Sequence, residues 1–218
     1  MFTHVIFDLD GTLLDTLEDL ADATNWVCQQ HGWPTHPVEA YKRFVGNGAG
    51  KLLECVIPEG VEPTPELRKE LMEEFAQRYS AHKQDKTAPY PGILQVLESV
   101  KKAGIPMGVL TNKPHAAAAP IVEHYFQGIF QTVQGAEEGF PTKPDPTLLY
   151  KMMDRIGAKK ETTLFVGDSN VDIRTAKNGG LTSCGVLWGF RDREELTGEG
   201  ADFLAENAEE LAAVIFGV

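Results

Sequence analysis

Short apolar runs rich in β-branched residues recur along most of the chain, and stretches with helical periodicity separate them. The first run covers 5–7, and four more follow at 105–110, 129–133, 162–166 and 183–188. Strands that alternate with helices are typical of a parallel sheet whose two faces are both covered. The pattern therefore predicts an α/β fold with a Rossmann-like, mostly parallel sheet.

Residues 15–88 have a different pattern, with no clear strand and at least two amphipathic helices. In 17–28 the apolar positions fall on one helical face. In 64–79 a Thr-Pro-Glu start precedes similarly spaced apolar residues, and proline is favoured at the first helical position. We therefore expect an α/β catalytic core of 1–14 and 89–218 with an inserted α-helical cap at 15–88. A cap that closes over a strand-end site would exclude water from it.

The charge balance narrows the range of partners. The chain carries 32 acidic and 20 basic residues, a net charge of −12, whereas nucleic acids and anionic membranes attract concentrated basic patches. No uncharged apolar run approaches the ~18 residues that span a bilayer. The first apolar run has no basic leader, and the three cysteines form no CxxC pair. We expect a cytoplasmic protein, monomeric or homodimeric, with no nucleic-acid or membrane partner.

Candidate chemistry begins in the segment Asp8-Leu9-Asp10-Gly11-Thr12, which follows the first predicted strand. Side chains two residues apart on a strand point to the same side, and ligands bind at the carboxyl ends of strands in open α/β sheets. Gly11 allows a sharp turn there. Two neighbouring carboxylates repel each other unless a bound Mg²⁺ or a proton intervenes. Taken alone, the segment also fits ordinary turn and capping residues.

A second strand end carries a hydroxyl and an amide, Thr111 and Asn112, followed by Lys113-Pro114 at the expected start of a helix. The free N–H groups of a helix N-terminus bind phosphate well. A strand-end threonine beside such a terminus therefore predicts a phosphate-binding position.

Two further segments carry charge. Lys143, followed by Pro144, is expected to open another helix, and the alternative is an ordinary solvated lysine. Asp168 follows the strand predicted at 162–166, and Asp172 lies four residues later in the first turn of a helix. For Asp168, N-capping of that helix is the competing interpretation.

In chain order these segments read Asp-x-Asp-Gly-Thr, strand-end Thr, Lys-Pro and Gly-Asp-x-x-x-Asp, and they span nearly the whole chain. This set resembles the haloacid dehalogenase-like superfamily. The resemblance implies a Mg²⁺-dependent phosphatase that acts on a small phosphorylated metabolite through an aspartyl-phosphate. A chain that had lost its catalytic residues could instead serve as a binding module, but Asp8, Asp10, Lys143 and Asp168 are all present.

The resemblance also implies a role for each matching residue. Asp8 would attack phosphorus, and Asp10 would protonate the leaving oxygen and then take a proton from water. Lys143 would offset the charge of the nucleophile and the phosphate. The phosphoryl oxygens would be bound by Thr111 and the Asn112 backbone. The Mg²⁺ ligands would be Asp8, the Asp10 carbonyl and Asp168, with support from Asp172.

Asp10 also distinguishes branches of the superfamily. The dehalogenases lack an acid at this position because a halide leaves without a proton. The phosphonate-cleaving branch lacks the acid as well. An acid here therefore favours phosphoryl chemistry.

The helical insertion contains a glycine-rich stretch, 42–51, whose spacing fits neither GxGxxG nor a Walker motif. We interpret it as a loop between cap helices, and the candidates to meet a substrate carboxylate or phosphate are Gly48 and the basic residues Lys42, Arg43 and Lys51. A glycine-rich connection with solvated charges fits as well. This block and 90–114 resemble phosphoglycolate phosphatases, which implies 2-phosphoglycolate as the substrate. Phosphatases for nucleotides, pyrophosphate or sugar phosphates, and β-phosphoglucomutase-like phosphomutases, share much of the pattern.

Overall fold

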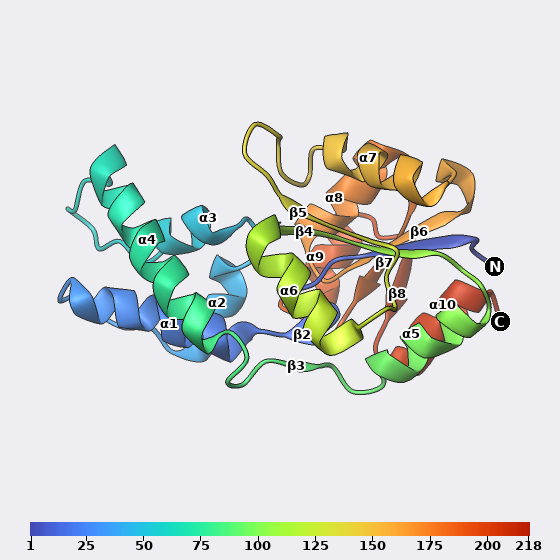
Figure 1. Ribbon diagram of the computed structural model, residues 1–218, viewed down its shortest axis with the longest axis horizontal. Helices are drawn as coiled ribbons and strands as arrows, with labels where there is room; N and C mark the ends of the chain where they lie inside the picture. The colour runs from blue at the N-terminus through green and yellow to red at the C-terminus, as the bar shows by residue number, and fades with distance from the viewer. The chain divides into compact units, whose positions relative to one another are not determined.

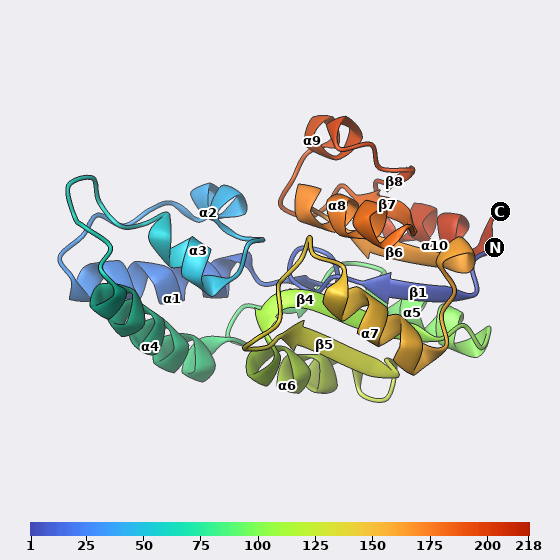
Figure 2. The same cartoon turned by 90° about the horizontal axis from the view of Figure 1, so that it is seen from above.

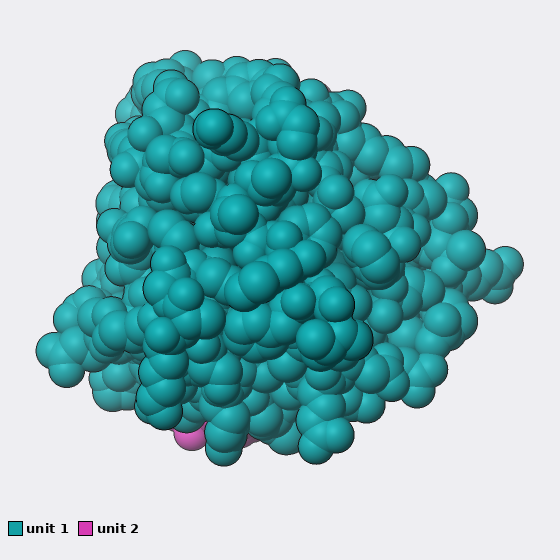
Figure 3. Space-filling model, turned by 90° about the vertical axis from the view of Figure 1, so that its right-hand side faces the viewer, with its two compact units in different colours: residues 1–14, 89–218 teal, residues 15–88 magenta.

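The computed structural model describes residues 1–218, and the chain divides into two compact units, which are coloured separately in Figure 3. Unit 1 comprises Met1–Leu14 and Pro89–Val218, and unit 2 comprises Asp15–Ala88. The chain therefore leaves unit 1 after its first strand and returns to it once.

Unit 1 is built on a six-stranded sheet in which all paired strands are parallel (Figure 1). The strands are β1 (His4–Phe7), β4 (Met107–Pro114), β5 (Thr132–Ala136), β6 (Thr163–Gly167), β7 (Thr182–Val186) and β8 (Phe203–Ala205). Their order is β5-β4-β1-β6-β7-β8, so β1 lies between β4 and β6. The predicted α/β fold with a mostly parallel sheet is confirmed.

Helices cover both faces of this sheet. They are α5 (Ile93–Lys102), α6 (His115–Phe126), α7 (Thr147–Ile156), α8 (Asn170–Gly179), α9 (Arg193–Gly198) and α10 (Ala208–Phe216), with the 3₁₀ turn η1 (Lys160–Thr162). Val5 and Phe7 of β1 pack in one core with α5, α6 and α10, whereas Ile6 packs on the opposite face with α7 and α8. Figure 1 shows α7 and α8 above the sheet and α5 and α10 below it. Strand β1 is thus enclosed on both sides, which fixes the position of its carboxyl end.

The two edge strands of the sheet, β5 and β8, differ from the prediction. The strand predicted at 129–133 is wrong in its bounds, because β5 begins at Thr132. Ile129 and Phe130 pack against the core instead, so their apolar character reflects burial rather than strand pairing. Strand β8 is an additional strand beside β7, and its three residues are too few to show a period-2 pattern in the sequence.

Unit 2 contains four helices, α1 (Leu17–Gln30), α2 (Val38–Phe44), α3 (Ala49–Glu54) and α4 (Pro65–His82), which are seen from a second side in Figure 2. Helix α4 begins as predicted, with the Thr64 hydroxyl accepting the Leu67 N–H at 3.2 Å. No helix of either unit combines the length and the apolar character that crossing a membrane requires.

The first helix of unit 2 is tied to the end of the unit by one buried carboxylate. Asp19 accepts hydrogen bonds from the backbone N–H groups of Lys86 and Thr87 and from the Thr87 hydroxyl. The short strand β2 (Leu14–Asp15), which precedes α1, pairs with the short strand β3 (Ala88–Pro89), which follows Thr87. The two passages of the chain between the units therefore lie side by side.

Candidate active site

The carboxyl end of β1 places Asp8 between two neighbouring strands. Phe7 lies opposite Val109 of β4 and Val166 of β6, and the Asp8 N–H donates to the Val166 carbonyl at 2.8 Å. The polar residues that follow β4 and β6 therefore reach the same edge of the sheet as Asp8, as expected for parallel strands.

Gly11 has a positional requirement that only glycine meets. Its φ is +84°, and a Cβ placed there would lie 2.3 Å from an Asp168 carboxylate oxygen. The chain after β1 can therefore turn tightly against Asp168 only because Gly11 has no side chain.

Three buried carboxylates meet at this edge, and we call them the core cluster (Asp8, Asp168 and Asp172). One ligand oxygen from each lies within 4.8 Å of the others. The Lys143 ammonium lies 2.9 Å from Asp8 Oδ1 and 2.6 Å from Asp172 Oδ1, and its side chain is only 4% exposed. Three ionised carboxylates and one ammonium leave two uncompensated negative charges. Such a group requires a divalent cation or bound protons.

The pKa values of the core cluster reflect this crowding. Burial, and then the nearby Asp172 carboxylate, raises the pKa of Asp8 from 3.8 to about 7, although Lys143 opposes the change. The same two causes raise the pKa of Asp168 well above its usual range. Burial disfavours the charged form of Lys143, but Asp172 and Asp8 outweigh it and raise the pKa of the lysine. The all-oxygen donor set and the excess negative charge fit a hard divalent metal ion.

Asp168 is oriented from two sides. Its Oδ1 accepts the Thr12 hydroxyl at 3.1 Å, and its Oδ2 accepts the backbone N–H of Phe190 at 2.8 Å. The N-cap of α8 is Ser169. The alternative interpretation of Asp168 as a helix cap is therefore wrong, because its carboxylate faces the loops after β1 and β7.

Asp172 is occupied by protein groups on both oxygens. Oδ2 accepts the Ser169 N–H at 3.0 Å and the Ser169 hydroxyl at 2.6 Å, while Oδ1 contacts Lys143. This leaves Asp172 well placed to hold Lys143 and the start of α8 together.

Asn112 holds the segment that carries Lys143. Its Oδ1 accepts the Lys143 N–H at 2.8 Å, and its Nδ2 donates to the Lys143 carbonyl at 3.1 Å. The prediction that Lys143 opens a helix is wrong, because α7 begins only at Thr147. The side chain of Asn112 fixes Lys143 in a loop instead, and this loop directs its ammonium into the core cluster.

Strand β4 is longer than predicted. Lys113 and Pro114 were expected to open a helix, but β4 continues through them and α6 begins at His115. Pro114 is paired with Ala136 of β5, which keeps the chain extended to that point. The Thr111 hydroxyl accepts the Lys113 N–H at 3.2 Å.

Lys113 is a site residue that the sequence analysis missed. Its ammonium lies 3.0 Å and 3.1 Å from the two carboxylate oxygens of Asp10, and its side chain is 4% exposed. Asp10 is thus paired with its own lysine, whereas Asp8 and Asp172 share Lys143. The strand period could have identified this residue, because positions 111 and 113 of an extended chain point to the same side.

The cap candidates lie in unit 2 around a short loop between helices. Arg43 is exposed in α2, Lys51 is exposed in α3, and Gly48 is the N-cap of α3 with a φ of +85°. The Lys51 ammonium lies 2.7 Å from Oε2 of Glu54. Their contact with a substrate stays a prediction.

Comparison with known proteins identifies the family of the chain. Residues 5–186 match the haloacid dehalogenase-like hydrolase family. A phosphoglycolate phosphatase of Vibrio parahaemolyticus is 33% identical over 97% of this chain and 95% of its own length. One of Vibrio cholerae is 31% identical over 97% of this chain and 96% of its own length. The structure of a candidate phosphoglycolate phosphatase of Lactobacillus delbrueckii subsp. bulgaricus matches with a TM-score of 0.91 at 32% identity, covering 98% of each chain.

Open parallel α/β sheets bind ligands at the carboxyl ends of their strands, and the buried carboxylates and Lys143 of this chain lie at that edge. The chain belongs to the haloacid dehalogenase-like hydrolases. Its activity class within that family is phosphoric monoester hydrolysis.

Proposed function

We propose that this hydrolase depends on Mg²⁺ and converts 2-phosphoglycolate into glycolate and phosphate. The observation that carries the proposal is the buried core cluster with Lys143 at the end of β1. The relatives named as phosphoglycolate phosphatases support the choice of substrate, because the chain covers nearly their whole length.

Mg²⁺ would be held by Asp8, the Asp10 carbonyl and Asp168, and it would neutralise charge that otherwise repels an anionic substrate. Asp172 is the carboxylate least available to an ion, because its oxygens already contact Lys143 and Ser169. Its role is to support Lys143 and the neighbouring ligand, Asp168.

In the first step an Asp8 oxygen attacks phosphorus, and the bond from phosphorus to the glycolate oxygen breaks. Asp10 donates a proton to that leaving oxygen, so glycolate departs as an alcohol. Lys143 lies against Asp8 and offsets the charge of the phosphoryl group as it is transferred. Thr111 and the Asn112 backbone would bind the phosphoryl oxygens.

In the second step a water molecule attacks the aspartyl-phosphate. Asp10 takes a proton from the water, the bond between phosphorus and the Asp8 oxygen breaks, and phosphate leaves. The Lys113 ammonium donates to both oxygens of the Asp10 carboxylate. Lys113 is therefore a positioning residue for Asp10, which donates a proton in the first step and accepts one in the second. The carboxylate of 2-phosphoglycolate would be met by basic or backbone groups of unit 2, for which Arg43, Gly48 and Lys51 are the candidates.

The test is phosphate release from a panel of substrates with and without Mg²⁺. The panel contains 2-phosphoglycolate, nucleoside monophosphates, sugar phosphates and pyrophosphate, and Asp8→Asn serves as the blank. Asp154→Asn is the matched control, since Asp154 is exposed on α7. We expect a preference for 2-phosphoglycolate that EDTA and Asp8→Asn abolish and Asp154→Asn retains.

The other outcomes separate substrate from mechanism. Metal-dependent release from a different compound would contradict the substrate and retain the chemistry. Release that survives in Asp8→Asn would contradict the nucleophile. Transfer of phosphate between positions of a sugar phosphate, without release, would replace hydrolysis by a mutase reaction.

A further inference from the structure

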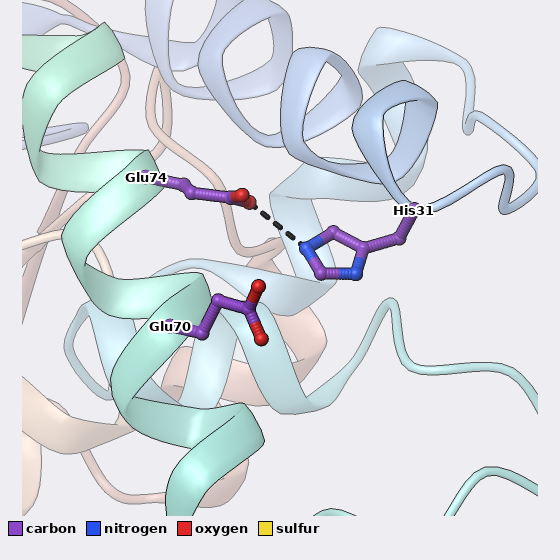
Figure 4. Close-up of side chains that lie close together, drawn as sticks. All are labelled: His31, Glu70 and Glu74. Atoms are coloured by element: carbon purple, nitrogen blue, oxygen red, sulfur yellow. Dashed lines mark hydrogen bonds and ion pairs between the residues drawn. The ribbon is translucent and has the colours of Figure 1, made fainter.

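Unit 2 contains a second group of side chains with metal-binding chemistry, which we call the helix cluster (His31, Glu70 and Glu74). His31 directly follows α1, and the two glutamates lie one turn apart on α4, so their side chains share one face of that helix. Figure 4 shows all three side chains directed into the space between the two helices. One ligand atom from each lies within 4.8 Å of the others, and His31 Nε2 lies 2.9 Å from Glu74 Oε2.

The charge of the helix cluster is not balanced by the protein. No Lys or Arg side chain forms an ion pair with Glu70 or Glu74, and Glu70 has no hydrogen-bond partner at all. Their neighbour Glu73 on the same helix pairs with Lys69, which shows the usual arrangement. Like charges one helical turn apart destabilise a helix, so these two carboxylates gain from any cation that enters between them.

The imidazole is held in a fixed orientation. The ring of Trp33 lies against the ring of His31, with centroids 4.9 Å apart and planes inclined by 34°. The side chain of Glu74 approaches Nε2, which places that nitrogen on the side of the glutamates. The donor set is therefore one aromatic nitrogen from the residue after α1 and two carboxylate oxygens from α4.

We propose that the helix cluster binds one divalent transition-metal ion, with Zn²⁺ as the best fit. Imidazole nitrogen suits Zn²⁺ and similar ions, whereas Mg²⁺ prefers oxygen ligands and water. Zinc sites bind His nitrogen and carboxylate oxygen at roughly 2.0–2.2 Å, and the present spacing of the ligand atoms needs only small side-chain rotations to reach that range. Because Glu70 is exposed, the ion exchanges with solvent and keeps water ligands.

A metal ion at this position would link the end of α1 to the middle of α4. It binds only when both helices are in place, so it stabilises folded unit 2 by an amount that grows with the logarithm of the metal concentration once the site is mostly filled. The site is separate from the core cluster and does not depend on the proposed phosphatase reaction.

The first experiment measures bound zinc in the intact protein. Wild type, Glu70→Gln, His31→Gln and the control Glu73→Gln are dialysed against the same low Zn²⁺ concentration in excess Mg²⁺, and the metal per chain is determined by mass spectrometry. Any zinc at the core cluster is common to all four proteins. We expect wild type and Glu73→Gln to hold one more zinc per chain than Glu70→Gln and His31→Gln. Equal zinc in all four would overturn the proposal.

Thermal unfolding gives a second test, because zinc should reverse the sign of the difference in unfolding temperature between wild type and Glu70→Gln. Glu70→Gln removes an exposed, unpartnered carboxylate, so without zinc this variant should unfold at the same temperature as wild type or slightly higher. With zinc, the unfolding temperature of wild type should rise by several degrees, whereas that of Glu70→Gln should not change. Wild type should then unfold at the higher temperature of the two. An equal rise in both proteins would contradict binding at the helix cluster, even if His31→Gln failed to fold.

Discussion

The core cluster and the helix cluster contain similar residue types and differ in their surroundings. Every carboxylate of the core cluster is buried, and each has at least one specific protein partner. In the helix cluster Glu70 is exposed and has no hydrogen-bond or ion-pair partner, and the half-buried imidazole of His31 is the one hydrogen-bond and ion-pair partner of Glu74. The pKa of Asp8 is raised to about 7, mainly by burial.

The comparison teaches what burial adds to a carboxylate. Water screens exposed charges, so a surface group of acids is tolerated without dedicated partners. Buried acids need hydrogen bonds, a cation or a proton, so the core cluster is surrounded by Thr12, Ser169 and Lys143. Similar residue types therefore fit both the proposed nucleophile in unit 1 and the proposed exchangeable ion in unit 2.

The largest effect is expected from the nucleophile. Asp8→Asn should lower phosphate release by at least about 10³-fold, because the amide cannot form the aspartyl-phosphate. The same acid-to-amide change at Glu73 on the surface of α4 should leave the rate unchanged. Steady-state kinetics on 2-phosphoglycolate, with circular dichroism to confirm folding, gives the answer. A loss below tenfold in Asp8→Asn would break the distinction between the two regions.

A smaller but still large effect concerns stability. Lys143→Met removes the only cation that contacts Asp8 and Asp172 and should cost about 3–5 kcal/mol of unfolding free energy in EDTA. Lys69→Met, which breaks the exposed pair with Glu73, should cost about 0–1 kcal/mol. Urea unfolding of both variants measures the difference. Similar losses of unfolding free energy in the two variants would show that a buried ion pair contributes no more to stability than an exposed one.

The pH dependence of the metal-free protein should come from the core cluster. The pKa of Asp8 is about 7 in the folded protein and lies near 3.8 when the chain unfolds, so between these values the folded state binds more protons. Stability should therefore fall as pH rises from about 4 to about 7, and Asp8 should contribute no further change above that. Asp8→Asn should reduce this slope in thermal unfolding with EDTA, and Asp168, whose pKa is raised by the same causes, should contribute the part that remains. An unchanged slope would assign the titration to other groups.

The smallest expected effect lies in unit 2. Arg43→Ala should raise the KM for 2-phosphoglycolate by roughly fivefold, since an exposed charge contributes about 1 kcal/mol. The KM for p-nitrophenyl phosphate, which has no carboxylate, should not change. Comparing KM for the two substrates isolates the carboxylate contact, and a parallel change in both would exclude it.

Much of the core could be predicted from local patterns. Strand-end acids after apolar runs indicated Asp8 and Asp168, because chain order and the parallel-sheet rule place such residues at one edge. The two misplaced helix starts had a common cause. Proline after Lys113 and Lys143 fits a helix start, but pairing with β5 extends one segment, and the amide of Asn112 holds the other as a loop.

The sequence by itself predicted five of the six strands of the sheet in their chain order, the helical character of 15–88 and the residue types at each strand end. These depend on short-range periodicity and turn chemistry, which neighbouring residues encode. Only the tertiary structure decided that Lys113 contacts Asp10, that the Phe190 N–H binds Asp168, and that His31 meets Glu74. Each of these contacts joins residues more than 20 positions apart, and the packing of whole elements, rather than any local pattern, brings them together.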